Sequence, residues 1–199
     1  MIELRKSDLF VQWLDDLVDI QARARVQARI ERLAAGNPGD VEPVGEGVSE
    51  LRINYGPGYR VYFKKRGREL IILLAGGDKS TQARDIKAAL RLARNLGVAT
   101  MKKTVTTRYD VAEHLRTPEE MAAYLEACLE EADGDAAFIA KALGDIARAK
   151  GMSQVARDAG LSRESLYKAL SGERSPDFDT ILKVIGALGL KLHAEANNG

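Results

Sequence analysis

The stretch Met101-Lys102-Lys103 lies at the midpoint of the 199-residue chain and has the form of a second N-terminus. The residues before it have the pattern of a domain's C-terminal end, namely a basic stretch followed by Gly97. The sequence therefore indicates one domain over residues 1–96 and another over residues 104–195, with a short junction at 97–103. Each part has close to the ~100 residues that are typical of an independent domain.

The two halves differ in charge. Residues 1–100 contain 17 Lys and Arg against 13 Asp and Glu, whereas residues 101–199 contain 13 against 16. The whole-chain net charge of +1 thus combines a basic half with an acidic half. Because a basic surface attracts nucleic acid, we expect a nucleic-acid-directed first half and a second half able to hold it in check.

Composition excludes several other classes of protein. Hydrophobic residues make up 45% of the chain and charged residues 30%, as in soluble globular proteins. No apolar run approaches the ~18 residues of a membrane span, and the first residues lack an apolar signal core, so we expect a cytoplasmic protein without membrane contact. Cys128 is the single cysteine, and His114 and His193 stand far apart. We therefore expect no disulfide, no metal site and no cofactor.

The first half predicts an α+β domain. Ser7 is suited to cap a helix over 8–19, and a second helix over 21–35 would complete a helical hairpin. Aromatic and β-branched runs then predict an antiparallel sheet, and the last apolar pattern predicts a C-terminal helix. The predicted strands are 49–54, 59–64 and 69–75, and the final helix is 80–95.

The second half predicts an all-α domain, or nearly so. Thr117 and Pro118 begin a helix that should run to about residue 132. Residues 105–115 remain open between a short strand and an extended arm, and residues 190–194 have the pattern of a short final strand. The further predicted helices are 135–150, 153–159, 163–170 and 177–188.

Residues 153–172 have the spacing of a helix-turn-helix. Ser153 would cap the first helix, Gly160 would end it, and Ser162 would cap the second. The second helix would then present a polar face, whose N-terminal end enters the major groove in DNA-binding motifs of this kind. The alternative is an ordinary helical hairpin with a solvated face. The candidate DNA-binding residues are Arg163, Glu164, Ser165, Tyr167 and Lys168.

A second candidate site lies on the predicted sheet. Strand alternation places Arg60, Tyr62 and Lys64 on one face, which Arg52 and Lys79 can join from neighbouring segments. Such a face suits an RNA backbone and a stacked base. Because this half has no histidine, Lys, Arg and Tyr must carry any RNA cleavage. The alternative is that these residues are solvated strand partners and a salt-bridged loop.

The first half contains the motifs Glu50-Leu51-Arg52, Gly58-Tyr59-Arg60-Val61-Tyr62-Phe63 and Leu73-Leu74-Ala75-Gly76-Gly77-Asp78-Lys79-Ser80-Thr81-Gln82, the last continuing through Asp85-Ile86. These motifs resemble the phage Gp49-like/HigB family of the RelE superfamily of toxins. The resemblance implies a RelE-like fold and an endonuclease that cleaves mRNA, usually on the ribosome. It also implies that Arg52 and Arg60 hold the phosphate. Lys79 would then act as general acid, general base or charge stabiliser, supported by Tyr62 and Lys64.

The second half resembles the HigA-like antitoxins of the Xre-type helix-turn-helix class, most specifically over residues 156–170 and 176–188. The resemblance implies operator-DNA binding as a dimer and binding to a cognate toxin. Toxin before antitoxin is also the HigBA gene order, so the resemblance implies a type II toxin–antitoxin module on one chain. Natural fusion, engineered fusion and two chains written consecutively all remain open.

The way the second half would silence the first also stays open. It could cover the Arg52, Arg60 and Lys79 face, or its bulk could prevent entry into the ribosome. The acidic residues within 119–133 are one candidate contact, although such a run is also typical of a solvated helix face. Two other classes are a DNA-binding repressor with an inactive toxin-like domain and a module that docks on the ribosome without cleaving.

Overall fold

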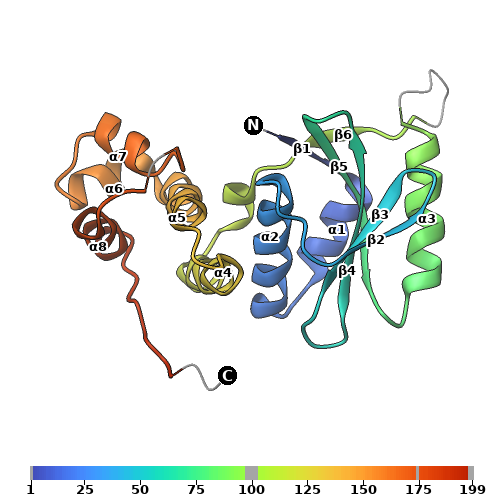
Figure 1. The fold of residues 1–199 in the computed structure, drawn as a ribbon, viewed down its shortest axis with the longest axis horizontal. Helices are drawn as coiled ribbons and strands as arrows, with labels where there is room; N and C mark the ends of the chain where they lie inside the picture. The colour runs from blue at the N-terminus through green and yellow to red at the C-terminus, as the bar shows by residue number, and fades with distance from the viewer. Residues whose placement is uncertain (1, 97–102, 174, 197–199) are drawn as a thin grey trace. The chain divides into compact units, whose positions relative to one another are not determined.

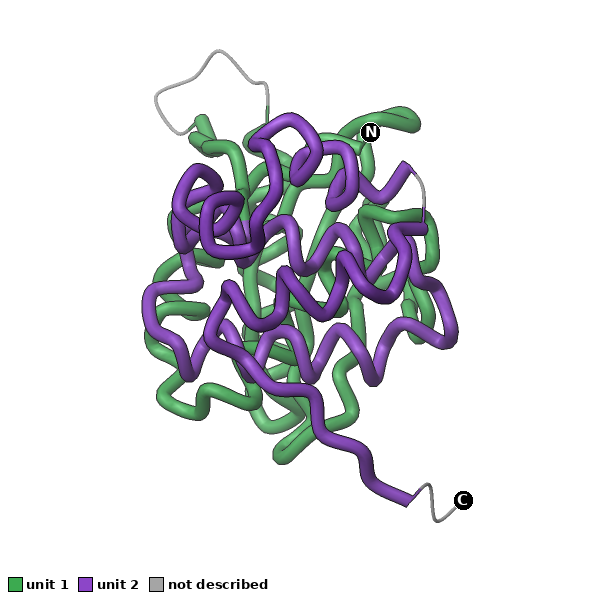
Figure 2. The backbone as a smooth tube through the Cα atoms, turned by 90° about the vertical axis from the view of Figure 1, so that its left-hand side faces the viewer, with its two compact units in different colours: residues 1–110 green, residues 111–199 purple. Residues whose placement is uncertain are grey.

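A computed structural model describes residues 2–96, 103–173 and 175–196, and the chain forms two compact units. The first unit is Met1–Asp110 and the second is Val111–Gly199 (Figure 2). The junction expected at 97–103 lies outside the described residues except for Lys103. The boundary between the units follows residue 110, because residues 104–110 are part of the first unit's fold.

The described residues of the first unit form a six-stranded sheet in the order β2-β3-β4-β5-β1-β6 (Figure 1). β1 runs parallel to β5, and all the other neighbouring strands are antiparallel. The three strands predicted at 49–54, 59–64 and 69–75 do pair antiparallel, but the parallel pairing of β1 with β5 makes the sheet as a whole mixed and not antiparallel throughout. The strands are β1 Glu3–Ser7, β2 Val41–Gly45, β3 Val48–Ile53, β4 Tyr59–Arg66, β5 Leu70–Asp78 and β6 Thr106–Arg108.

Helices cover both faces of the sheet. α1 (Asp8–Asp16) packs against β5 and β1, and α2 (Ile20–Ala34) packs against β3 and β4. α3 (Gln82–Arg94) packs on the opposite face against β5, β4 and β3 (Figure 1). The two helices expected at 8–19 and 21–35 are thus present, but each packs against its own pair of strands.

Local chemistry explains where α1 begins. The Ser7 hydroxyl accepts a hydrogen bond from the backbone N–H of Phe10 at 3.2 Å, which satisfies one of the unpaired donors of the first turn. The same hydroxyl donates to the carbonyl of Leu74 at 2.6 Å and so ties the start of α1 to β5. The predicted cap is confirmed.

The face under α3 has its own apolar core. Tyr62 and Leu74 are fully buried there beside Ala89 of α3. Small side chains at this helix face let α3 approach the sheet closely, so that this part of the sheet is sealed from solvent. The buried members of this core are Val48, Tyr62, Ile72, Leu74, Ala75, Ala89, Ala93 and Leu96.

The described part of the second unit is helical. Its elements are the 3-10 helix η1 Val111–His114 and the α-helices α4 Pro118–Glu131, α5 Ala136–Lys150, α6 Met152–Asp158, α7 Arg163–Ala169 and α8 Phe178–Ala187. Thr117 and Glu120 form a reciprocal capping box at the start of α4, which confirms that helix start. Residues 190–194 have no regular structure, so the short strand expected there was wrong. No described helix is both long enough and apolar enough to cross a membrane.

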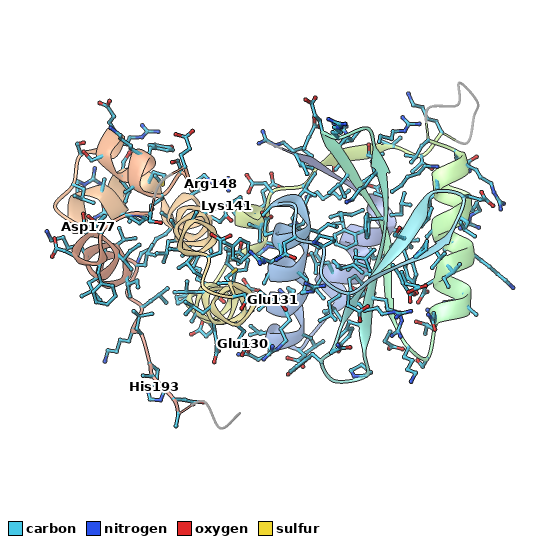
Figure 3. The ribbon with its side chains drawn as sticks, in the orientation of Figure 1. Glu130, Glu131, Lys141, Arg148, Asp177 and His193 are labelled. Atoms are coloured by element: carbon cyan, nitrogen blue, oxygen red, sulfur yellow. The ribbon has the colours of Figure 1, made fainter. Side chains whose placement is uncertain are left out.

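A buried carboxylate joins α4 to α5. Asp145 of α5 is 3% exposed and accepts a hydrogen bond from the hydroxyl of Tyr124 on α4 at 3.0 Å. Lys141 and Arg148, one helical turn to either side on α5, form ion pairs with the same carboxylate (Figure 3). The charge of Asp145 is therefore compensated locally, as a buried charge requires.

Candidate nucleic-acid-binding sites

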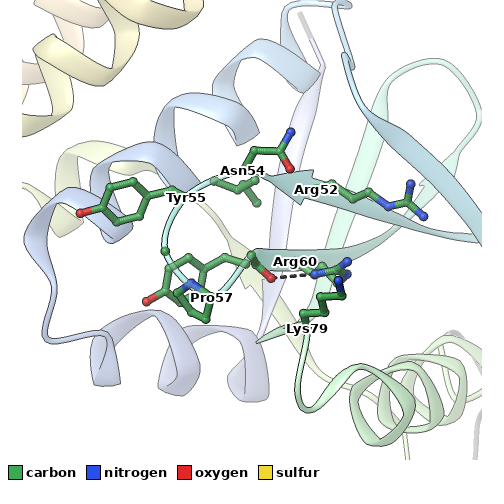
Figure 4. Close-up of a pocket in the computed structure, with 10 residues that line it drawn as sticks. Arg52, Asn54, Tyr55, Pro57, Arg60 and Lys79 are labelled. Atoms are coloured by element: carbon green, nitrogen blue, oxygen red, sulfur yellow. Dashed lines mark hydrogen bonds between the residues drawn. The ribbon is translucent and has the colours of Figure 1, made fainter.

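The first unit has a cavity of about 400 Å³ where β3 ends and β4 begins (Figure 4). Arg52 of β3 and Arg60 of β4 lie directly opposite each other in the sheet register. Lys79, in the loop between β5 and α3, reaches the same cavity. Cavity-lining residues are Arg52, Ile53, Asn54, Tyr55, Gly56, Pro57, Gly58, Tyr59, Arg60 and Lys79.

Gly58 allows the cationic side chains to come together. Its φ of +78° lies in the left-handed region, which favours glycine. A Cβ atom at this position would lie 3.4 Å from a terminal guanidinium nitrogen of Arg60 and 3.8 Å from Cβ of Lys79. Arg60 also donates a hydrogen bond to the carbonyl of Gly58 at 2.7 Å (Figure 4). The turn thus holds Arg60 beside Lys79.

Glu50 is the counter-ion of both arginines. Its side chain is 1% exposed, and it accepts a hydrogen bond from Nε of Arg52 at 2.9 Å. Nε of Arg60 lies 3.6 Å from the other carboxylate oxygen, to which Nε2 of Gln82 donates at 3.0 Å. The carboxylate therefore holds Arg52 by a hydrogen bond and lies at ion-pair distance from Arg60, whose Nε has no hydrogen-bond partner among the described residues. Its hydrogen bond also raises the pKa of Arg52 further above the ordinary arginine value, so that Arg52 stays charged.

Two of the five residues expected at this site lie elsewhere. Tyr62 shares the face of Arg60, as alternation predicts, but α3 covers that part of the face and Tyr62 is fully buried. Burial, followed by the negative charge of Glu50, raises the pKa of Tyr62 well above its ordinary value. The phenol is therefore neutral and cannot reach the cavity.

Lys64 lies farther along β4. Its Nζ donates to the carbonyl of Glu46 at 2.9 Å, in the turn between β2 and β3. It stands four positions after Arg60, which corresponds to ~13 Å along a strand. The cavity thus brings together Arg52, Arg60 and Lys79, and leaves Tyr62 and Lys64 outside.

The loop that carries Lys79 follows two tightly packed glycines. A Cβ atom on Gly76 would lie 2.0 Å from the Trp13 ring of α1, and a Cβ atom on Gly77 would lie 1.8 Å from the Asp85 carboxylate of α3. Asp78 then accepts hydrogen bonds from Ser80, which lower the pKa of its carboxyl group. The motif Gly76-Gly77-Asp78 therefore shapes the loop and leaves Lys79 exposed beside the cavity.

Sequence reasoning missed Glu50 as part of this site. The signal was available, because Glu50 stands two residues before Arg52 and so shares its face of the strand. Tyr55 and Tyr59, which also line the cavity, gave no comparable signal. Their place depends on the turn between β3 and β4 and on side-chain packing, such as Arg25 over the Tyr55 ring at 4.9 Å.

In the second unit, α6 and α7 are joined by the expected tight turn. Gly160 has a φ of +67°, its N–H donates to the Arg157 carbonyl at 3.1 Å, and the N–H of Leu161 donates to the Ala156 carbonyl at 2.9 Å. These are the paired bonds of a Schellman helix end. Ser162 then caps α7 by accepting from the N–H of Ser165 at 3.0 Å.

One expected cap is wrong. α6 begins at Met152, with Gly151 at the cap position and no side-chain cap bond, so Ser153 lies inside the first turn. The helix begins earlier because the buried side chain of Met152 continues the apolar face formed with Val155 and Ala156.

The candidate DNA-binding residues share the outer face of α7, while Leu166 is fully buried beneath them. The guanidinium of Arg163 lies 5.5 Å from the centre of the Tyr167 ring, a cation–π contact within α7. These two residues border a cavity of about 440 Å³ that also includes Arg157. All five predicted residues, Arg163, Glu164, Ser165, Tyr167 and Lys168, are exposed.

The described residues include no cluster of three His, Cys, Asp or Glu side chains that could hold a metal ion. Cys128 is buried in α4. Guanidinium, amine, amide and aromatic side chains line the two cavities, and such groups suit phosphate and base contacts.

Comparison with known proteins divides the chain between residues 96 and 105, before the boundary of the two structural units. Residues 12–96 match the family described as "Phage derived protein Gp49-like", and residues 105–196 match the family described as "Probable addiction module antidote protein". The chain therefore belongs to the Gp49-like family through its first half and to the addiction module antidote family through its second.

Two proteins of Haemophilus influenzae (strain Rd) are similar to parts of the chain. One is 50% identical over 97 residues, which are 49% of this chain and 98% of the relative. The other is 54% identical over 87 residues, which are 44% of this chain and 88% of the relative. Both carry the description "Uncharacterized protein". No solved structure matches the chain.

Proposed function

We propose that the chain is a type II toxin–antitoxin module in which the first half cleaves mRNA and the second half holds it inactive. The observation that carries this proposal is the arginine cavity of the Gp49-like half, on a chain that continues into an addiction module antidote half. The ribosome dependence that is usual for HigB-like toxins is part of the proposal, as is the HigA-like assignment of the second half.

Under this proposal, the cations of the cavity would take part in RNA cleavage. In this reaction the 2′-oxygen bonds to phosphorus, the bond from phosphorus to the 5′-oxygen breaks, and a proton passes from the 2′-hydroxyl to a base while another reaches the 5′-oxygen. Arg52 and Arg60 would stabilise the added negative charge on the phosphate. Lys79, which is exposed and lines the same cavity, would exchange a proton beside them.

Expression of residues 1–110, which form one compact unit, tests the toxin assignment. Growth arrest is expected from this unit but not from the full chain. Replacing Arg60 and Lys79 together by Ala should relieve the arrest. Lys65→Ala is the matched control, because Lys65 is exposed on β4 and does not line the cavity. Harmless accumulation of the folded wild-type unit would contradict the assignment.

Mapping of mRNA ends after induction distinguishes a nuclease from a module that docks on the ribosome without cleaving mRNA. New 5′ ends that disappear in the double Ala variant are expected from a nuclease. Unchanged messages together with slowed growth would favour docking alone.

We also propose that the second half binds operator DNA through α7 and so represses its own promoter as a dimer. The exposure of Arg163, Ser165 and Lys168 on α7 supports this, because Arg and Lys can read guanine and Ser can contact phosphate. A gel shift with palindromic upstream DNA should show binding that weakens steeply with salt. Arg163→Ala should weaken it at least about tenfold, the effect of losing one base contact.

The second candidate function is a DNA-binding repressor whose toxin-like half is inactive. The position of Glu50 favours it, because one buried carboxylate already engages both arginines of the cavity. Under this candidate, operator binding persists while residues 1–110 cause no arrest and create no new message ends.

A further inference from the structure

Strand β6 belongs by sequence to the antidote half but completes the sheet of the Gp49-like half. The antidote family match begins at residue 105, whereas Thr106, Thr107 and Arg108 pair antiparallel with Ser7, Lys6 and Arg5 of β1. β1 would otherwise be an open sheet edge, and such an edge readily accepts an added strand (Figure 1).

Specific polar contacts fix the register of this pairing. The Arg5 guanidinium donates to the Thr106 hydroxyl at 3.0 Å and to the Thr106 carbonyl at 2.6 Å. The backbone N–H of Tyr109 donates to the carbonyl of Leu4 at 2.9 Å and so extends the ladder beyond the strand. A slip of one residue would break all three bonds.

Contacts at both ends anchor the segment further. Tyr109 is 4% exposed, and its ring meets Phe10 of α1 edge-on at 6.2 Å while the amine of Lys6 lies 5.8 Å from the ring centre. At the other end, Thr104 donates from its hydroxyl to Leu92 at 2.9 Å and from its N–H to Asn95 at 3.1 Å, where it satisfies carbonyls at the end of α3.

We propose that residues 103–110 are a strand-addition clasp that holds the antidote half on the Gp49-like half without needing the covalent junction. The β1 edge would therefore bind residues 103–110 even when these residues are on a separate polypeptide, such as the second fragment of a cleaved chain. β5 and β1 lie between β4 and β6 in the sheet, a separation of ~14 Å at the usual strand spacing. The clasp therefore binds without covering the cavity of Arg52, Arg60 and Lys79.

A cut full-length chain tests the clasp. A recognition site for a specific protease is placed within residues 97–102, and the purified protein is cleaved. The two fragments should elute together in native size-exclusion chromatography. With the first fragment immobilised, Tyr109→Ala and Arg5→Ala should each speed the departure of the second fragment at least about tenfold, as expected for a lost buried ring or charged hydrogen bond.

Val105→Ala is the matched control, because Val105 is 64% exposed and lies in the same segment. The proposal would be overturned if the two wild-type fragments separated at once. It would also be overturned if, in both variants, the second fragment dissociated from the first at the wild-type rate. If Tyr109→Ala proves unfolded by circular dichroism, Arg5→Ala decides, because its side chain is 36% exposed and outside the core. The readout is binding alone, so a lack of RNA cleavage would count against the proposed function and not against the clasp.

Discussion

Glu50 illustrates how one buried residue organises a charged surface. Its carboxylate lies beneath Arg52 and Arg60 and is also held by Gln82 at the start of α3. A buried charge is tolerated only when it is paired and hydrogen-bonded, and here the pairing also orients the two guanidinium groups. Removal of the charge should therefore affect both the stability of the first unit and the geometry of its cavity.

Glu50→Gln keeps the size and the hydrogen-bonding oxygen of the side chain but removes its charge. We expect the free energy of unfolding to fall by ~1–3 kcal/mol, because buried hydrogen bonds from charged donors lose their ionic partner. Urea denaturation of the purified chain measures the change. Glu42→Gln, at an exposed position on β2, should stay within ~0.5 kcal/mol of wild type. Equal stability of the two variants would contradict the assigned role.

Asp177 gives a pH-dependent prediction. It caps α8 by accepting a hydrogen bond from the backbone N–H of Thr180. This bond is the main cause that lowers the pKa of the Asp177 carboxyl, and the side chain of Thr180 adds to the effect. A folded-state pKa below the unfolded value of ~3.9 means that its stabilisation is present above that value and is lost as pH falls through the folded pKa. An NMR titration should place its midpoint below that of ordinary aspartates. A midpoint at or above the ordinary value would contradict the cap.

At the scale of elements, the turn between α6 and α7 depends on caps at defined positions. Ser162→Ala should cost ~1 kcal/mol because it removes the bond to the N–H of Ser165. Ser153→Ala should cost much less, because Ser153 is exposed inside the first turn of α6 and caps nothing. Chemical denaturation followed by helical circular dichroism compares the two, and a larger loss from Ser153→Ala would reverse the assignment.

Close packing on β5 gives a second prediction at this scale. Gly76→Ala would place a methyl group 2.0 Å from the Trp13 ring, so α1 must shift, at a cost of ~1–3 kcal/mol. Gly186→Ala in α8 is the opposite case, because no atom lies within 4 Å of the added Cβ. That variant should gain ~0.5–1 kcal/mol from helix propensity. Thermal melts of the two variants should therefore shift in opposite directions.

At the scale of the whole molecule, capped helices and long apolar strands were predictable from the sequence. Ser7, Thr117 and Ser162 marked helix starts, and the central strands β3, β4 and β5 lie where the aromatic, β-branched and apolar runs predicted them, to within three residues at each end. The sequence did not reveal β1, whose five residues Glu3–Ser7 contain a single aliphatic side chain and gain their pairing from residues far along the chain.

The candidate sites were predictable to a similar extent. Alternation correctly placed Arg60 and Tyr62 on one face, but it could not tell which part of that face α3 covers. Tyr62 was therefore expected at the site and is instead core. Likewise, local pattern left 105–115 ambiguous, because a three-residue strand is decided by the edge it joins.

The place of β1 inside the sheet has a consequence for synthesis. This strand leaves the ribosome early, but its parallel partner β5 is synthesised much later. The pairing of β1 with β5 is therefore a non-local step, and such steps are slow in folding. The other edge of β1 remains unpaired until residues 106–108 have also been synthesised. Translation must therefore already have entered the antidote half before the Gp49-like sheet can be finished, so the order of synthesis makes completion of the first unit depend on residues 106–108 of the antidote half.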